Sequence, residues 1–133
     1  MRRLILIAAM MLAGLPAAKA ANCDNATDQA TMNACADKAL KAADAELNAV
    51  YKKITHRLAD EPDTGKQLVA AQRAWIAFRD AQCTFASSAV SGGSAYPMVH
   101  AMCLDDLTRS RVADLKALLD CEEGDMSCPV PAE

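Results

Sequence analysis

Aromatic side chains are scarce in this 133-residue chain, which contains two Phe, two Tyr and one Trp. Much of the remaining apolar content is alanine, which buries little surface on folding. A chain of this length and composition predicts one domain with a thin hydrophobic core. Such a core needs extra restraints, and disulfides are the usual source in small domains. Dimerisation would also add to a thin core, so the sequence leaves the oligomeric state open, with a dimer as one outcome.

After residue 20 the sequence has no apolar run long enough to cross a bilayer. The one apolar run, residues 4–15, follows two arginines and precedes the pattern Ala18-Lys19-Ala20, so residues 1–20 are predicted to be a cleaved export signal. Cys23 follows Asn22 and not the small residue that precedes a lipid-modified cysteine. We therefore expect a soluble protein that is periplasmic or secreted.

All six cysteines follow the predicted signal, and an even number in a small exported domain predicts a disulfide framework. They are Cys23, Cys35, Cys83, Cys103, Cys121 and Cys128. The helices described below favour pairing Cys83 with Cys103, Cys121 with Cys128, and Cys23 with Cys35. Six cysteines allow about 15 connectivities, and sequence alone cannot choose among them.

Basic residues are too few for a nucleic-acid-binding surface. The chain has 14 Lys and Arg against 17 Asp and Glu. Removal of the predicted signal takes away Arg2, Arg3 and Lys19, so the remaining chain has a net charge of about −6. This charge favours cationic partners by steering their encounter, although ordinary solubility accounts for it as well.

Apolar residues recur at helical spacing in three segments, and no segment alternates with the period of a strand. The first runs from 27 to 58 with Asn25 or Thr27 as its cap, the second from about 65 to 88, and the third from Pro97 to near Gly124. Short connections predict an all-α fold, a small antiparallel three-helix bundle stapled by disulfides. We assign residues 21–121 to this domain and residues 122–133, which contain two prolines, to an extended or frayed tail.

The sequence lacks the signatures of common active sites, so we predict that the protein is not an enzyme. There is no G-x-S-x-G motif, and the two histidines, His56 and His100, are far apart in the sequence. There is no C-x-x-C pair, and His100 with Cys103 supplies only two ligands of a metal site. The adjacent acidic pairs splay around their helix, unlike glycosidase carboxyls. No cofactor or metal is expected.

The most distinctive segment is residues 71–83, AQRAWIAFRDAQC. Gln72, Trp75, Arg79 and Cys83 lie on one face of the predicted helix, where the Arg79 guanidinium can lie over the indole of Trp75. The simplest interpretation is structural: the face buries Trp75, while Arg79 or Asp80 pairs with a neighbouring helix, for instance through Arg111 or Asp44.

On this segment the chain resembles the LprI-like lysozyme-inhibitor family of small exported bacterial proteins. The motif residues are Gln72, Arg73, Trp75, Phe78, Arg79 and Asp80. Further matching segments are residues 31–36, 43–51, 92–94 and 108–111, together with Cys103. The resemblance covers most of the chain after the predicted signal, although Cys121 and Cys128 lie outside the shared pattern.

The resemblance implies an exported protein that binds a lysozyme and blocks peptidoglycan hydrolysis. Our hypothesis places the contact on the glycine-rich loop between the second and third helices, with residues Gly92, Gly93, Ser94, Tyr96 and His100. The alternative is a disulfide-stapled helical module of the cell envelope that binds or scaffolds other components and has no lysozyme partner.

Overall fold

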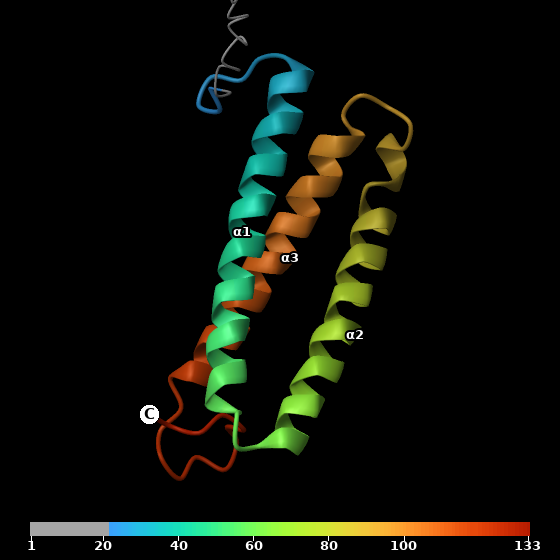
Figure 1. The fold of residues 1–133 in the computed structure, drawn as a ribbon. Helices are drawn as coiled ribbons and strands as arrows, with labels where there is room; N and C mark the ends of the chain where they lie inside the picture. Colours follow the sequence, from blue (N-terminus) through green and yellow to red (C-terminus); the bar gives the residue numbers. More distant parts are fainter. Residues whose placement is uncertain (1–21) are drawn as a thin grey trace, which may run out of the picture.

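The structure, a computed structural model, describes residues 22–133, and its regular elements in this range are all helical. Helix α1 spans Gln29–Arg57, α2 spans Pro62–Ala86, a short 3₁₀ helix η1 spans Ser88–Val90, and α3 spans Tyr96–Leu119. The three long helices pack together, which confirms the predicted all-α fold (Figure 1). The predicted signal, residues 1–20, lies outside the described residues.

The helix ends follow local chemistry, and two of them correct the predictions. Asp28, and neither Asn25 nor Thr27, caps α1: its carboxylate accepts a hydrogen bond from the Thr31 N–H at 2.9 Å. Helix α3 ends at Leu119, before the predicted end near Gly124. Gly124 lies in a turn with φ +84°, a left-handed conformation that ends helical geometry and that glycine adopts without strain.

The large apolar core lies in the half of the bundle nearest the α1–α2 turn. It combines side chains of α1, of α3 and of the C-terminal tail: Leu47, Val50, Ile54, Leu58, Val112, Leu115 and Val130. Helix α1 packs along α3, whereas α2 contacts α3 over a shorter stretch and diverges from α1 (Figure 1). The diverging end therefore depends on polar contacts and covalent links.

Three disulfides supply the covalent links, and they are the pairs that the helix pattern favoured. Cys23–Cys35 ties the N-terminal segment to α1, Cys83–Cys103 joins α2 to α3, and Cys121–Cys128 closes the tail on itself. The first two links lie in the half of the bundle away from the main core, and Cys128 of the third packs against that core.

Of the two states predicted for the C-terminal tail, extended or frayed, the structure shows an extended tail that packs on the bundle. It has no regular helix, but Val130 is only 3% exposed and packs into the core cluster. Arg57 holds both ends of the tail, because it donates to the Leu119 carbonyl at 2.7 Å and pairs with the Glu133 carboxylate at 3.1 Å. In residues 22–133 no helix has the length and hydropathy of a membrane span.

Candidate binding surface at the α2–α3 end

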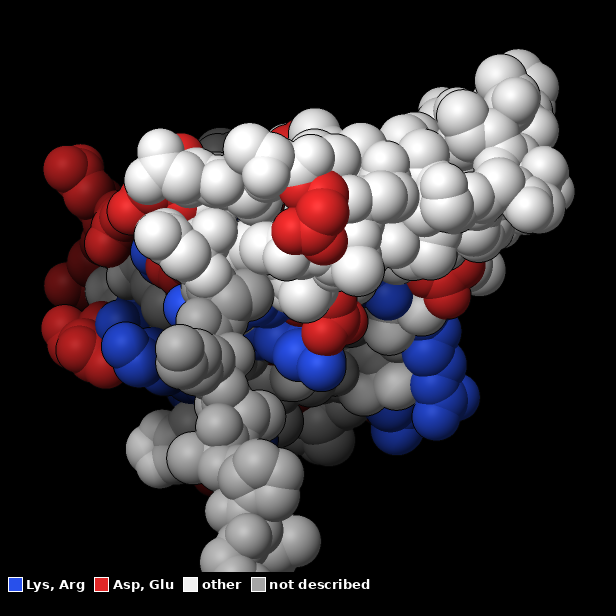
Figure 2. Space-filling model, turned by 90° about the horizontal axis from the view of Figure 1, so that it is seen from above, with Lys and Arg blue, Asp and Glu red and all other residues white. Residues whose placement is uncertain are grey.

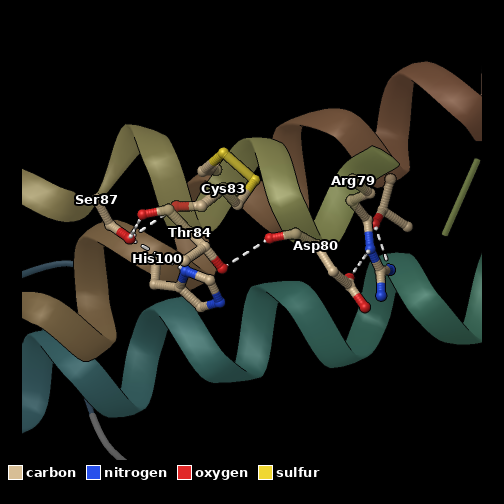
Figure 3. The surroundings of a disulfide bond; sticks show 8 residues. Arg79, Asp80, Cys83, Thr84, Ser87 and His100 are labelled. Carbon is tan, nitrogen blue, oxygen red and sulfur yellow. Dashed lines mark hydrogen bonds and ion pairs between the residues drawn. A yellow bond between two sulfur atoms is a disulfide. The ribbon is translucent and has the colours of Figure 1, made fainter. Parts of the chain in front are cut away.

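The end of the bundle that joins α2 to α3 is built around the Cys83–Cys103 disulfide. Cys83 is fully buried, and so is Ser87 one turn later (Figure 3). The Ser87 hydroxyl donates to the Cys83 carbonyl at 2.7 Å, and its oxygen lies 3.2 Å from Nδ1 of His100. A hydroxyl has one hydrogen, so Nδ1 of His100 is the donor in the second contact. Ser87 and His100 are thus arranged to hold the helix ends together and not as nucleophile and base.

The loop itself is closely constrained. Gly92 has φ +76°, which favours glycine, and a Cβ added to Gly93 would lie 3.2 Å from the Val90 carbonyl oxygen. Helix α1 also holds this loop, because the Asn33 side-chain amide donates to the Ser94 carbonyl at 3.0 Å. The glycines thus allow a tight turn that a neighbouring helix keeps in place.

Two of the predicted contact residues, Tyr96 and His100, lie in the first turn of α3 and not in the loop. Their rings stack with centroids 5.3 Å apart and an interplanar angle of 14°, and both side chains are half-buried. Tyr96 therefore supports His100 in addition to presenting part of its own surface.

Residues 81–104 contain no Asp, Glu, Lys or Arg, although 23% of the whole chain is charged. This uncharged tip, as we call residues 81–104, comprises the end of α2, the loop and the start of α3. Figure 2 looks down on this end and shows the projecting part as white, with charged side chains elsewhere. The tip also exposes 75% of Phe85. The sequence analysis did not identify Phe85 as a surface residue, although the absence of charged residues from 81 to 104 can be seen in the sequence.

One face of the 71–83 segment lies inside the bundle, because Gln72, Trp75, Arg79 and Cys83 are buried or half-buried and the other residues are exposed. Arg79 donates to the Asp44 carboxylate at 3.1 Å and to the Thr108 hydroxyl at 3.2 Å, so it links α2 to both other helices. The Trp75 ring contacts two guanidinium groups, that of Arg79 at 5.2 Å from the ring centroid and that of Arg111 at 5.9 Å. The structural interpretation of the motif therefore matches the geometry, with Asp44 as the interhelical partner of Arg79.

The remaining motif residues divide between the interior and the surface. Gln72 is buried and accepts a hydrogen bond from Nε of Arg111 at 3.1 Å. Asp80 pairs with Arg79 beside it and not with Arg111. Arg73 and Phe78 are exposed on the outer surface of α2, below the tip.

The other chemistry-bearing residues are separated. His56 lies near the end of α1, at the pole of the bundle opposite His100, and Cys103 is in a disulfide. Within residues 22–133 no group of three or more His, Cys, Asp or Glu side chains could hold a metal ion.

Among ionisable groups, hydrogen bonds shift several pKa values outside the tip. A hydrogen bond from Lys116 lowers the pKa of Glu46 and links α1 to α3. The hydrogen bond that Arg109 donates to the Asp105 carboxylate raises the pKa of Arg109 within α3. The charged groups thus stabilise the flanks of the bundle and leave the tip neutral.

Comparison with known proteins gives three matches. A family model described as lysozyme inhibitor LprI matches residues 21–115. An uncharacterized protein of Rhizobium meliloti (strain 1021) is 40% identical over 113 residues, which cover 77% of this chain and 81% of that protein. The crystal structure of a DUF1311 family protein from Pseudomonas putida KT2440 has a TM-score of 0.59 and 28% identity, covering 68% of this chain and 92% of that one.

The fold and its three disulfides define a small, covalently linked helical protein of the kind that oxidising compartments favour. Because the family model spans most of the described residues, the chain belongs to the LprI lysozyme inhibitor family.

Proposed function

We propose that the protein is exported, binds a lysozyme and blocks peptidoglycan hydrolysis by placing the uncharged tip in the substrate cleft. The observation that carries this proposal is membership of a family described as lysozyme inhibitors. The geometry of the α2–α3 end supports it in three respects: charge, rigidity and an exposed aromatic side chain.

The distribution of charge suits such a complex. A net charge of about −6 after the predicted signal would steer the chain toward a basic enzyme such as an animal lysozyme. The cleft of a glycosidase, however, contains two catalytic carboxyl groups. An acidic side chain inserted there would meet like charge, whereas residues 81–104 bring none.

Rigidity reduces the entropy that binding costs. The Cys83–Cys103 disulfide closes the base of the tip, and the hydrogen bond from Asn33 to Ser94 fixes the loop against α1. A protrusion that is ordered before binding can occupy a cleft without losing much conformational freedom.

Phe85 is the strongest candidate anchor on the tip, because three quarters of its surface is exposed in the free protein. Burying a phenylalanine side chain contributes about 2 kcal/mol, which corresponds to about a 30-fold change in affinity. Such exposed aromatic residues are typical centres of protein interfaces.

A matched pair of substitutions tests the proposal. Phe85→Ala is expected to weaken inhibition of lysozyme by about 30-fold. Phe78→Ala removes the same side chain two turns earlier on α2, where it is 56% exposed and outside the tip, and should leave inhibition unchanged. Equal effects of both variants, or no effect of either, would contradict the tip as the contact surface.

A second candidate function is general binding of cationic envelope components, with no lysozyme partner. The opposite end of the bundle favours it, because acidic side chains line a depression of about 660 Å³ there: Glu61, Glu122, Glu123, Asp125 and Glu133. A protein acting through this end would bind cytochrome c as readily as lysozyme, and Phe85→Ala would not change that binding.

A further inference from the structure

A second, apolar cavity of about 290 Å³ lies between the three helices near the α1–α2 turn, at the end of the bundle away from the tip. All three helices and the tail contribute to its wall, with Ile54, Leu58, Leu68, Ala71, Leu115, Leu118, Pro129 and Val130 as apolar members. Its volume is close to the lower limit for small-ligand sites, which are mostly apolar and carry few polar groups.

Among residues 22–133, Arg111 is the only charged residue in the wall of this cavity. Its side chain is half-buried, donates through Nε to the neutral Gln72 amide and lies over Trp75. Within residues 22–133 no carboxylate forms an ion pair with it, whereas Arg79, which contacts the same indole, has Asp44 and Asp80. A guanidinium beside apolar walls and without a counter-charge is suited to bind an anion.

The cavity is charged at one end and apolar along its length. Arg111 and Ala71 line it on the side toward the middle of the helices, while Thr64 and Val130 line the end closed by the tail. From Thr64 to Ala71 the helix rises by about 10 Å. Below the tail end the acidic depression begins, and it shares Thr64, Pro129 and Val130 with the apolar cavity. The charges thus set one orientation for an anionic ligand, with its head at Arg111 and its chain toward the tail.

We propose that this cavity binds a single-chain anionic amphiphile, with a carboxylate or phosphate head on Arg111 and a medium-length alkyl chain between the helices. The tail covers the chain end of the site, because Pro129 and Val130 line the cavity and Val130 is almost fully buried. The Cys121–Cys128 disulfide and Arg57 anchor the tail. The site is independent of the tip and of lysozyme binding.

Trp75 provides the measurement, because it is the only tryptophan of the chain and lies against Arg111. We would titrate the oxidised protein with decanoate, below the concentration at which decanoate forms micelles, and follow the tryptophan emission. The expected result is a saturable change in tryptophan emission with decanoate. Decanol should bind at least tenfold more weakly than decanoate, and decylamine more weakly still. Decyl phosphate should bind at least as well as decanoate, since it has the same chain and its head is also an anion.

Two arginine variants on the same helix separate recognition from general charge. Arg111→Gln should weaken the binding of decanoate at least tenfold and remove the preference of the protein for decanoate over decanol. Arg109→Gln is the matched control: Arg109 is exposed, pairs with Asp105 and does not line the cavity, so decanoate binding should stay within twofold of the original.

Several results would overturn the proposal. They are the absence of a saturable change with decanoate, equal binding of decanoate and decanol, or tighter binding of decylamine. If Arg111→Gln does not fold, these three comparisons on the unaltered protein still decide. A further variant, Leu68→Phe, narrows the apolar cavity without altering its charge. It should weaken the binding of decanoate and of decanol to the same extent. Unchanged binding by a folded Leu68→Phe variant would place the ligand elsewhere.

Discussion

Removing the disulfide at the base of the tip is expected to destabilise the fold and abolish inhibition together. We consider the double variant Cys83→Ala and Cys103→Ala, which leaves no free thiol at this site. The two cysteines are 20 residues apart, and closing a loop of this size stabilises the folded state by about 3 kcal/mol through the entropy of the unfolded chain. Because Cys83 is fully buried, the lost sulfur also leaves a small void, which adds to the cost.

The assay is equilibrium unfolding in urea without reductant, with lysozyme inhibition measured on the same preparations. The control is the double variant Cys121→Ala and Cys128→Ala, whose cysteines are 7 residues apart at the other end of the bundle. This control should lower the free energy of unfolding by about 2.5 kcal/mol and leave inhibition intact under conditions in which the protein is folded. A loss below about 1 kcal/mol for the Cys83 and Cys103 variant, or full inhibition by it, would refute the reasoning.

Three further predictions concern the core, the loop and the carboxylates. Ile54→Ala should lower the free energy of unfolding by about 3 kcal/mol in urea, because Ile54 is fully buried in the main core; a cost near zero would mean that this core is loosely packed. Gly92→Ala should cost about 1 kcal/mol by the same assay, since φ +76° strains any residue with a Cβ, and an unchanged midpoint would contradict the turn. The melting temperature should decrease when the pH is lowered below about 4, because hydrogen bonds from Lys116 and Thr31 hold the pKa values of Glu46 and Asp28 below their usual range. A carboxylate with a lowered folded-state pKa stabilises the fold above its unfolded-state pKa and loses that contribution as the pH falls through the folded value. Glu46→Gln should flatten this dependence, and an unaltered pH profile in that variant would contradict the role of the α1–α3 pair.

The spacing of apolar residues and the positions of the cysteines were enough to predict most of the fold. Apolar residues at steps of three and four fixed the number and order of the helices, and the position of each cysteine relative to them favoured the pairs that the structure contains. The ion pair of Arg79 with Asp44 was one of the interhelical pairings that the sequence left open, and only the structure selects it.

The features that were missed depend on tertiary context. Val130 follows a proline in a short tail, so no local pattern predicts that it enters the core. The divergence of α2 from α1, seen in Figure 1, results from the balance of side chains at two interfaces, which periodicity does not encode. The apolar cavity combines residues of all three helices and of the tail, so the pattern along any one helix does not predict it. Phe85 has the spacing of a core residue but lies beyond the end of the core, so it is exposed.

The measurement that tests the central claim most directly is inhibition of hen and human lysozyme in a cell-wall lysis assay by the oxidised protein. Cytochrome c serves as a basic control ligand in a parallel binding experiment. The account predicts saturable inhibition that Phe85→Ala weakens by about 30-fold, with no comparable binding to cytochrome c. Absence of inhibition at tens of micromolar protein, or equal binding to both basic proteins, would contradict lysozyme inhibition as the function of this chain.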